Sequence, residues 1–562
     1  MNLEKSLEFA PFNLSASDIA WVKKTRDGLS TEAKLRQLFV HIMIGDDPVD
    51  AQRLGKLAAG GVHRFMGPDL DVAWQNTRTL LEMSEVPLFI TGDIEGGGHG
   101  APSMLHFPNQ LGLAAADDLE LSARLLNAVC AESKAFGFNW SFTPVVDVNK
   151  QAASSIVGTR SYGSDIEKII AQARVHIKTL QANGIAATAK HWPGEGYDSR
   201  DQHLVTTINP LTMNEWNEVF GRIYKTMIGD GVMTVMSAHI ALPHYMAQHG
   251  IPKSVERYRP ASLSKLLNQD LLRGELGFNG LVVSDATPMG GLTSWDDRAA
   301  SVPAVIENGC DVFLFCTDID RDFEHMKNGL RTGRLSEQRL EDAVTRILAM
   351  KAALGLHMKS LDQRLPPLDR ARATVKSADH LALAKAAADK SITLVKDVNH
   401  TLPLNVAKHK RITVIEQGGP PLFLGAPRKM MSVLTEQLKT SGFEIKPFDA
   451  AQPPSPENTD LLLYIFATES SLLLSRIYID WMAQHPNFGE AMQRYWHDVP
   501  TVMISFGHPY YLGDAPRVPT YINAYSTIAS VQQAVAEKLV GNAPFEGVSP
   551  VDAFAGAPDA EY

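Results

Sequence analysis

The segment from Lys190 to His203 holds the densest set of side chains suited to acid–base chemistry. Its sequence is Lys-His-Trp-Pro-Gly-Glu-Gly-Tyr-Asp-Ser-Arg-Asp-Gln-His, and it follows an apolar run typical of a buried strand. Asp201 and His203 stand two residues apart, so the carboxylate can hold the imidazole and stabilise its charge. A free imidazole has a pKa of about 6.5, and such a pair is therefore suited to general acid–base catalysis near neutral pH.

Two other interpretations of this segment are open. Pro193, Gly194 and Gly196 force a loop, and polar loops are commonly only solvated surface. A metal site would draw on four side chains of the segment, His191, His203, Glu195 and Asp198. We expect no metal, because the histidines lack the His-x-x-x-His spacing that places two ligands on one helix face.

A second candidate carboxylate is Asp285, at the end of the apolar stretch Gly280-Leu-Val-Val-Ser-Asp. A buried strand can hold such a side chain rigidly beneath a substrate, where it would act as a nucleophile or a base. The alternative is a structural role as the N-cap of a following helix.

The third candidate segment is the glycine-rich stretch from Thr91 to Gly100, which contains Asp93 and Glu95. It lacks the Gly-Lys-Ser/Thr of a phosphate loop, and it does not fit the dinucleotide-binding pattern. Paired acids beside glycines suit hydrogen bonding to vicinal hydroxyl groups of a closely approaching ligand. A serine hydrolase is not indicated, because the nearest match to its nucleophile elbow, at Ser505, lacks the first glycine.

The elements that must position these side chains alternate between short apolar runs and amphipathic stretches from about residue 30 to 355. This rhythm predicts parallel strands joined by helices, and polar residues follow each predicted strand, as in a (β/α)₈ barrel with its site at one mouth. The predicted strands are Val86–Thr91, Trp140–Val146, Ala186–Ala189, Val232–Ser237, Leu281–Ser284 and Val312–Cys316.

A second series of strands and helices predicts a smaller doubly wound α/β domain. Its predicted strands are Ile412–Ile415, Leu461–Phe466, Thr501–Ser505 and Thr520–Ala524. We therefore expect a TIM-barrel catalytic domain over residues 1–355, a linker and connecting helix over 356–395, and an α/β sandwich domain over 396–562.

Composition restricts the partners and the compartment. The 562 residues carry 53 Lys and Arg against 63 Asp and Glu, a net charge of −10, which disfavours nucleic acid and anionic membranes as partners. Three cysteines cannot build a disulfide framework, and the N-terminal segment lacks the basic start and apolar core of a signal peptide. We expect a cytoplasmic protein; the sequence leaves its oligomeric state open.

Taken together, these segments resemble the glycoside hydrolase family 3 pattern, in its bacterial β-N-acetylglucosaminidase branch. The matching motifs are Asp93-Ile-Glu-Gly-Gly97, Gly137-Phe-Asn-Trp-Ser-Phe-Thr-Pro-Val-Val-Asp147-Val, Arg160-Ser-Tyr-Gly163, Lys190 to His203, Pro260 to Asp285, Lys390 to Lys396 and Phe506 to Tyr510. Two positions depart from the family: Gly98 stands where an Arg is usual, and Glu195 where a His is often found.

The resemblance implies a retaining exo-acting hydrolase without a cofactor, acting on a small saccharide. Asp285 would be the nucleophile, and the Asp201–His203 pair the acid/base. The sugar-binding positions of the family carry over to Asp93, Asp147, Arg160, Lys190 and His191. In β-glucosidase relatives the acid is a Glu of the second domain, for which Glu469 is the candidate here.

The expected activity is release of terminal N-acetylglucosamine from chitin- or peptidoglycan-derived saccharides. The alternatives are a β-glucosidase or β-xylosidase of the same fold, and a catalytically silent sugar-binding relative. Phosphorolysis of N-acetylglucosaminides is a further alternative, because a neutral His repels an incoming phosphate less than a carboxylate would.

Overall fold

The chain divides into two compact units. The computed structural model describes residues 3–96, 100–419, 431–485 and 487–562. The first unit consists of residues 1–105, 122–148 and 169–380, and the second of 106–121, 149–168 and 381–562. The catalytic residues predicted from the barrel region, Asp201, His203 and Asp285, all belong to the first unit.

Over the described residues, the barrel of the first unit consists of eight parallel strands, and the unit also contains a short parallel pair, β6 (Thr207–Ile208) and β8 (Ile240–Ala241). The barrel strands are β1 (Phe39–Ile44), β2 (Gly61–Phe65), β3 (Phe89–Gly92), β4 (Trp140–Ser141), β5 (Thr188–Trp192), β7 (Thr234–Ser237), β9 (Leu281–Ser284) and β10 (Phe313–Leu314). The order β10-β1-β2-β3-β4 forms one ladder and β5-β7-β9 another. Parallel bridges between Trp140 and Ala186, and between Val283 and Val312, join the ladders at both seams. The strands therefore close into the predicted barrel.

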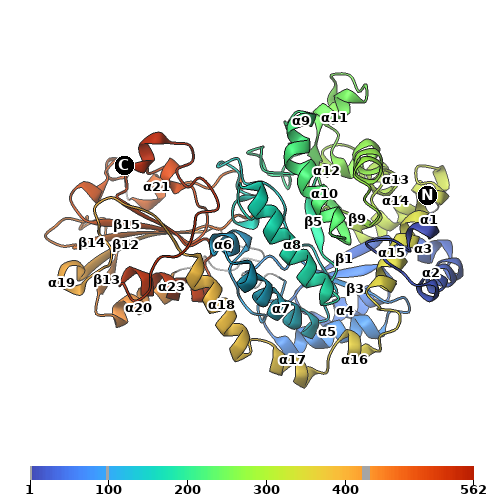
Figure 1. Ribbon diagram of the computed structural model, residues 1–562, viewed down its shortest axis with the longest axis horizontal. Coiled ribbons are helices and arrows are strands. Elements are labelled where there is room, and N and C mark those ends of the chain that lie inside the picture. The colour runs from blue at the N-terminus through green and yellow to red at the C-terminus, as the bar shows by residue number, and fades with distance from the viewer. Residues whose placement is uncertain (1–2, 97–99, 420–430, 486) are drawn as a thin grey trace. The chain divides into compact units, whose positions relative to one another are not determined.

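Helices lie around this barrel, as Figure 1 shows for α5, α7, α8 and α15. They span Leu70–Glu82, Leu119–Ala135, Ile166–Ala182 and Glu337–Ala353. Short polar residues cap several barrel helices: Asp69 accepts from the first turn of α5, and Ser336 from that of α15. Because each helix returns the chain to the same end of the barrel, the carboxyl ends of all strands meet at one mouth.

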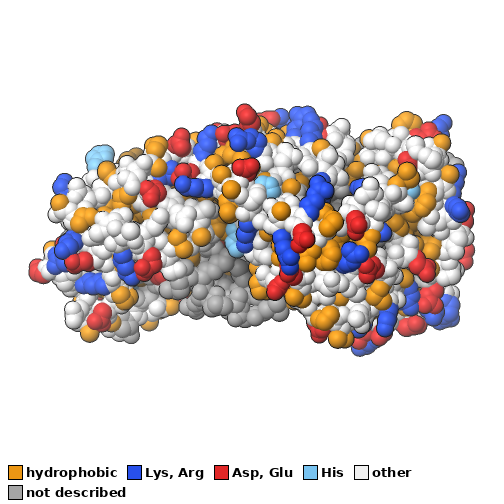
Figure 2. Space-filling model, turned by 90° about the horizontal axis from the view of Figure 1, so that it is seen from below, with side chains coloured by type: hydrophobic (Ala, Val, Ile, Leu, Met, Phe, Trp, Pro, Cys, Tyr) orange, Lys and Arg blue, Asp and Glu red, His pale blue; other side chains and the backbone are white. Residues whose placement is uncertain are grey.

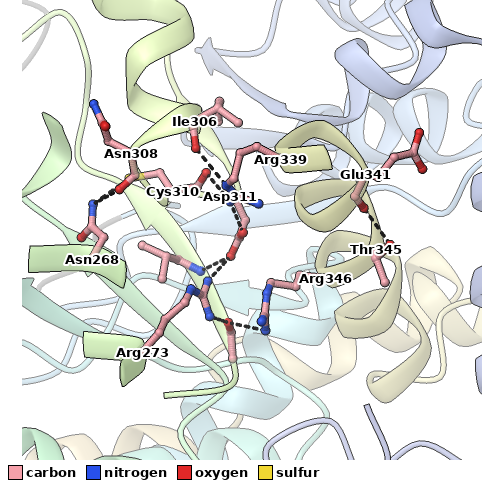
Figure 3. A network of polar contacts seen from close by, with 12 residues as sticks. Asn268, Arg273, Ile306, Asn308, Cys310, Asp311, Arg339, Glu341, Thr345 and Arg346 are labelled. Atoms are coloured by element: carbon pink, nitrogen blue, oxygen red, sulfur yellow. Dashed lines mark hydrogen bonds and ion pairs between the residues drawn. The ribbon is translucent and has the colours of Figure 1, made fainter. Parts of the chain in front are cut away.

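The opposite end of the barrel is held by a buried charge network around Asp311, just before β10 (Figure 3). Asp311 is fully buried and forms ion pairs with Arg273, at 2.7 Å, and with Arg339. Its Oδ2 also accepts from the backbone N–H of Val282, at 2.8 Å. Burial would raise the pKa of Asp311, but Arg273, Arg339 and Arg346 outweigh that effect and hold it below 3.8.

Asp311→Asn is expected to lower the free energy of unfolding by about 3–5 kcal/mol, because it leaves buried guanidinium groups without a counter-charge. The pKa of Asp311 is lowered by folding, so its stabilisation is present above the unfolded pKa and is lost as the pH falls through the folded one. Denaturant unfolding of both proteins at several pH values measures this, and the difference between them should shrink below about pH 4. The exposed Asp320→Asn is the control, with an expected change under about 1 kcal/mol. A pH-independent difference would contradict the ionised role of Asp311.

The second unit contains one six-stranded sheet in the order β11-β16-β15-β14-β12-β13. These strands are β11 (Thr393–Asp397), β12 (Arg411–Gly418), β13 (Glu444–Pro447), β14 (Leu461–Ala467), β15 (Thr501–Ser505) and β16 (Thr520–Asn523). Only β11 pairs antiparallel among them. Helices α20 (Ser432–Thr440) and α23 (Ala529–Leu539) cover one face, and α21 (Trp481–Gln484) lies over the other (Figure 1). This is the predicted doubly wound arrangement.

The surface agrees with the mixed charge composition. On the face shown in Figure 2, acidic and basic side chains are interspersed and form no large field of one sign. Among the helices of the described residues, none combines the length and the apolar character needed to cross a bilayer.

Candidate active site at the carboxyl end of the barrel

Asp285 directly follows β9, and its backbone N–H donates to the carbonyl of Ser237 at the end of β7, at 2.8 Å. Its side chain is almost fully buried. Oδ1 accepts from the N–H of Ala286, at 2.7 Å, while Oδ2 has no hydrogen-bond partner in the described part of the chain. A rigid carboxylate with one unengaged oxygen is what nucleophilic attack requires.

Three histidines keep this carboxylate ionised. Burial would raise the pKa of Asp285, but the imidazoles of His191, His239 and His203, with the Ala286 N–H, together hold it below 3.8. The ammonium of Lys190 is paired with two other carboxylates, Asp93 and Glu95.

The Asp201–His203 pair forms as predicted from the spacing. His203 Nδ1 lies 2.6 Å from Asp201 Oδ1, and the same oxygen accepts from the backbone N–H of His203, at 2.9 Å. Asp201 is inaccessible to solvent, whereas the His203 side chain is 19% exposed. With Nδ1–H donated to the carboxylate, Nε2 is the nitrogen that can exchange a proton with a substrate.

Backbone contacts bring this loop against the segment that follows Asp285. The N–H groups of Gly290 and Gly291 donate to the carbonyls of His203 and Gln202, at 2.9 and 3.1 Å. A Cβ atom at Gly290 would lie only 2.3 Å from the Leu204 carbonyl oxygen, so only glycine allows this approach. The acid/base candidate and the nucleophile candidate are thus parts of one local assembly.

The acidic side chains that follow β3 contact a buried lysine. Lys190 Nζ lies 2.7 Å from Asp93 and 2.8 Å from Glu95. His63 Nε2 is 3.4 Å from the other oxygen of Asp93. Burial would raise the pKa of Asp93, but Lys190 and His63 lower it well below 3.8. Gly97 of the predicted motif, and Gly98, lie outside the described residues.

Asp147, after β4, holds the start of the acid/base loop. Its Oδ2 is 2.6 Å from His191 Nδ1, and its Oδ1 accepts from the backbone N–H groups of His191 and Glu195, both at 3.0 Å. The ring orientation of His191 is therefore fixed by a carboxylate, and its Nε2 is left for a ligand.

Asp147, His191 and Glu195 have potential ligand atoms within 4.8 Å of one another, which raises the question of a metal. The carboxylate oxygens are already engaged: Asp147 as above, and Glu195 by Thr207 Oγ1 at 3.1 Å and Gln202 Nε2 at 3.0 Å. Of the four side chains considered from the sequence, Asp198 is paired with Arg200, at 2.6 Å. Hydrogen bonding accounts for the arrangement without a metal.

Arg160 and Glu469 belong to the second unit. Arg160 ends the short 3₁₀ turn Gly158–Arg160 and is half-buried. Both oxygens of Glu469 take part in hydrogen bonds of that unit: Oε1 with Thr527 N–H and Oγ1, at 2.9 and 2.6 Å, and Oε2 with Asn109 Nδ2, at 3.1 Å. These contacts give Glu469 a structural function there.

His63 and Gln202 are among the site residues that were not singled out in the sequence. His63 lies on β2, a strand that was not predicted, and its ring stacks on Phe142 with centroids 5.2 Å apart. Gln202 stands between the predicted acid/base residues and is completely buried. The presence of a glutamine in a charged loop does not by itself predict a function, and the function of Gln202 can be inferred only from its contacts in the structure.

Comparison with known proteins fits this geometry. The model of the glycosyl hydrolase family 3 N-terminal domain matches residues 31–350. A Cellulomonas fimi protein named β-N-acetylglucosaminidase/β-glucosidase is 38% identical over 563 residues, which cover 98% of each chain. A Methylobacillus flagellatus β-hexosaminidase is 30% identical over 200 residues, 36% of this chain and 54% of that protein.

Solved structures also resemble nearly the whole chain. A β-glucoside phosphorylase, BglX, solved with 2FGlc, has a TM-score of 0.91 and 35% identity, covering 98% of this chain and 100% of that one. A family 3 β-N-acetylglucosaminidase from Paenibacillus sp. has a TM-score of 0.80 at 24% identity, covering 94% and 100%, and is a likeness of fold. The family match over more than half of the chain and the full-length relative show that this protein belongs to glycoside hydrolase family 3.

Proposed function

We propose that this glycoside hydrolase is a retaining, exo-acting β-N-acetylglucosaminidase that removes terminal N-acetylglucosamine from small saccharides. The observation that carries the proposal is the Asp201–His203 pair on the loop after β5, next to a nucleophile candidate with a free Oδ2. The Cellulomonas fimi relative and several β-hexosaminidases bear names that support it.

In the proposed first step, Asp285 Oδ2 attacks the anomeric carbon and His203 donates its Nε2 proton to the departing glycosidic oxygen. The glycosidic bond breaks as the ester bond to Asp285 forms. His203 is then neutral and can take a proton from water, whose oxygen displaces Asp285 from the sugar. Asp201 holds the imidazole and stabilises its protonated form, as a carboxylate does in other acid–base pairs.

The sugar would be held by the polar groups at the mouth of the barrel. We assign hydroxyl recognition to Asp93, Asp147, Lys190 and His191, whose mutual hydrogen bonds fix their positions before substrate arrives. We also propose that Arg160 contacts the sugar, because the resemblance to the family places a sugar-binding residue at this position.

The specificity for N-acetylglucosamine is tested with matched 4-nitrophenyl β-glycosides. We expect kcat/KM for the N-acetylglucosaminide to exceed that for the glucoside and the xyloside. A larger value for the glucoside would favour the β-glucosidase alternative, to which the second half of the relative's name points. No turnover of any of the three would support a catalytically silent sugar-binding protein.

Phosphorolysis is the second candidate function, because the similar structure with 35% identity is a β-glucoside phosphorylase. After donating its proton, His203 is uncharged and leaves the mouth open to a phosphate dianion, which a catalytic carboxylate would repel. Adding inorganic phosphate should then yield N-acetylglucosamine 1-phosphate and raise the rate of deglycosylation. Free N-acetylglucosamine as the sole product at every phosphate concentration would exclude this candidate.

A further inference from the structure

The side-chain amide of Gln202 links the end of the acid/base loop to Glu195, near the start of that loop, and to His239, after β7. Nε2 donates to Glu195 Oε2, and Oε1 accepts from the backbone N–H of His239, both at 3.0 Å. The amide orientation follows from its partners, since a carboxylate only accepts and a backbone N–H only donates. Gln202 is completely buried, so water does not compete for either bond.

Glu195 anchors the other end of this contact. Its Oε1 accepts from Thr207 Oγ1, at 3.1 Å, and its backbone N–H donates to Asp147, at 3.0 Å. Its side chain is buried as well. Through Glu195, the position of Gln202 is therefore coupled to that of Asp147, which also orients His191.

His239 continues the chain of contacts to the nucleophile. Its Nε2 donates to the carbonyl of Ala286, at 3.0 Å, and its Nδ1 lies 2.8 Å from the Ser262 hydroxyl oxygen. Burial lowers the pKa of His239, and the charge of Asp285 opposes that effect. The Ala286 N–H in turn holds Asp285 Oδ1. One continuous path thus joins Gln202 to the nucleophile.

We propose that the Glu195–Gln202 pair is a positioning clamp that fixes His203 Nε2 relative to Asp285 for proton transfer to the leaving group. The proposal rests on the acid/base function proposed for His203. Gln202 is covalently adjacent to both members of the Asp201–His203 pair, so its two side-chain hydrogen bonds restrain the backbone from which both side chains extend. Misplacing a catalytic group by about 1 Å can cost about 10²-fold in rate.

The clamp is tested with Gln202→Leu, which keeps the size of the side chain and removes both hydrogen bonds. kcat/KM reports glycosylation alone, so it is compared for a disaccharide with a poor leaving group and for the 4-nitrophenyl glycoside. We expect a loss of about 10–10²-fold on the disaccharide, a much smaller loss on the aryl glycoside, and little change in KM.

Gln37→Leu is the matched control, because Gln37 is also buried and hydrogen-bonded, to Lys351 at 2.7 Å, at the amino end of β1. It should lower thermal stability without a leaving-group dependence. Equal losses on both substrates in Gln202→Leu, as in this control, would overturn the clamp.

Exchanging the two side chains gives a second test. Gln202→Glu places two carboxylates against each other and should behave like Gln202→Leu, with partial recovery at lower pH where they share a proton. The double variant Glu195→Gln/Gln202→Glu restores donor and acceptor in reversed order and should recover disaccharide activity to within a few-fold of the natural protein. A double variant as poor as Gln202→Glu would count against the clamp. Absence of glycosidase activity in the natural protein would instead refute the proposed function.

Discussion

Asp285→Ala is expected to lower kcat/KM for 4-nitrophenyl β-N-acetylglucosaminide by at least about 10³-fold, the scale of loss for a central catalytic group. The substitution removes the oxygen that would form the ester bond to the sugar, and no described carboxylate takes its place at the end of β9. Steady-state kinetics of the purified variant measures the loss.

The matched control is Asp369→Asn, since the Asp369 side chain is 95% exposed and its one ion pair lies within its own helix. It should keep the natural kcat/KM. Thermal unfolding of Asp285→Ala distinguishes lost chemistry from lost folding. A folded variant with more than about one tenth of the natural activity would contradict the nucleophile assignment.

His203→Ala is expected to lower kcat/KM for N-acetylglucosaminyl disaccharides by about 10²–10⁴-fold, the usual contribution of a positioned general acid. The 4-nitrophenyl glycoside should lose much less in kcat/KM, because its leaving group departs without a proton. Its kcat should still fall, since the glycosyl ester then lacks a base to activate water. Mass spectrometry of the intact variant during turnover should therefore detect the sugar attached to the protein.

Glu469→Gln separates this assignment from the β-glucosidase arrangement. The carboxylate of Glu469 is occupied by Thr527 and Asn109, so its replacement should reduce stability and affect both substrate types alike. If kcat/KM for disaccharides fell selectively in Glu469→Gln but not in His203→Ala, the acid/base function would be assigned to Glu469. The exposed His244→Ala serves as the control for His203→Ala and should leave the kinetics unchanged.

Several parts of the fold could be predicted because apolar runs and polar ends coincide in sequence. β9 and β15 occur at the predicted residues, and Asp285 lies at the strand end that the pattern indicated. The Asp201–His203 contact also followed from spacing alone. The local sequence was sufficient to predict strands with a continuous apolar run and contacts between residues that are close in the chain.

The strands β1 and β2 were missed because they carry polar residues that face buried partners. Arg64 on β2 is completely buried and pairs with Asp46, at 2.7 Å, and His63 contacts Thr91, at 2.9 Å. Such residues interrupt the apolar runs on which strand prediction relies. β11 was not predicted either; it spans the boundary between the predicted linker and second domain, and its pairing partner, β16, is more than 120 residues away in the chain.

Site contacts between distant segments were likewise invisible in the sequence. The clamp depends on Gln202, Glu195 and His239, and the last of these follows β7 rather than β5. The histidines that lower the pKa of Asp285 are His191 and His203, in the segment Lys190–His203, and His239, after β7. Spacing cannot report such contacts, because the fold rather than the chain brings these groups together.

The way the chain is shared between the two compact units has a practical consequence for engineering. The polypeptide leaves the first unit after residue 105, returns at 122, leaves again after 148, returns at 169 and departs finally after 380. No single cut can therefore release either half intact, and a hybrid with another glycosidase would have to exchange three stretches at once. Truncation after residue 380 would remove most of the second half yet keep residues 106–121 and 149–168, whose packing partners would be gone.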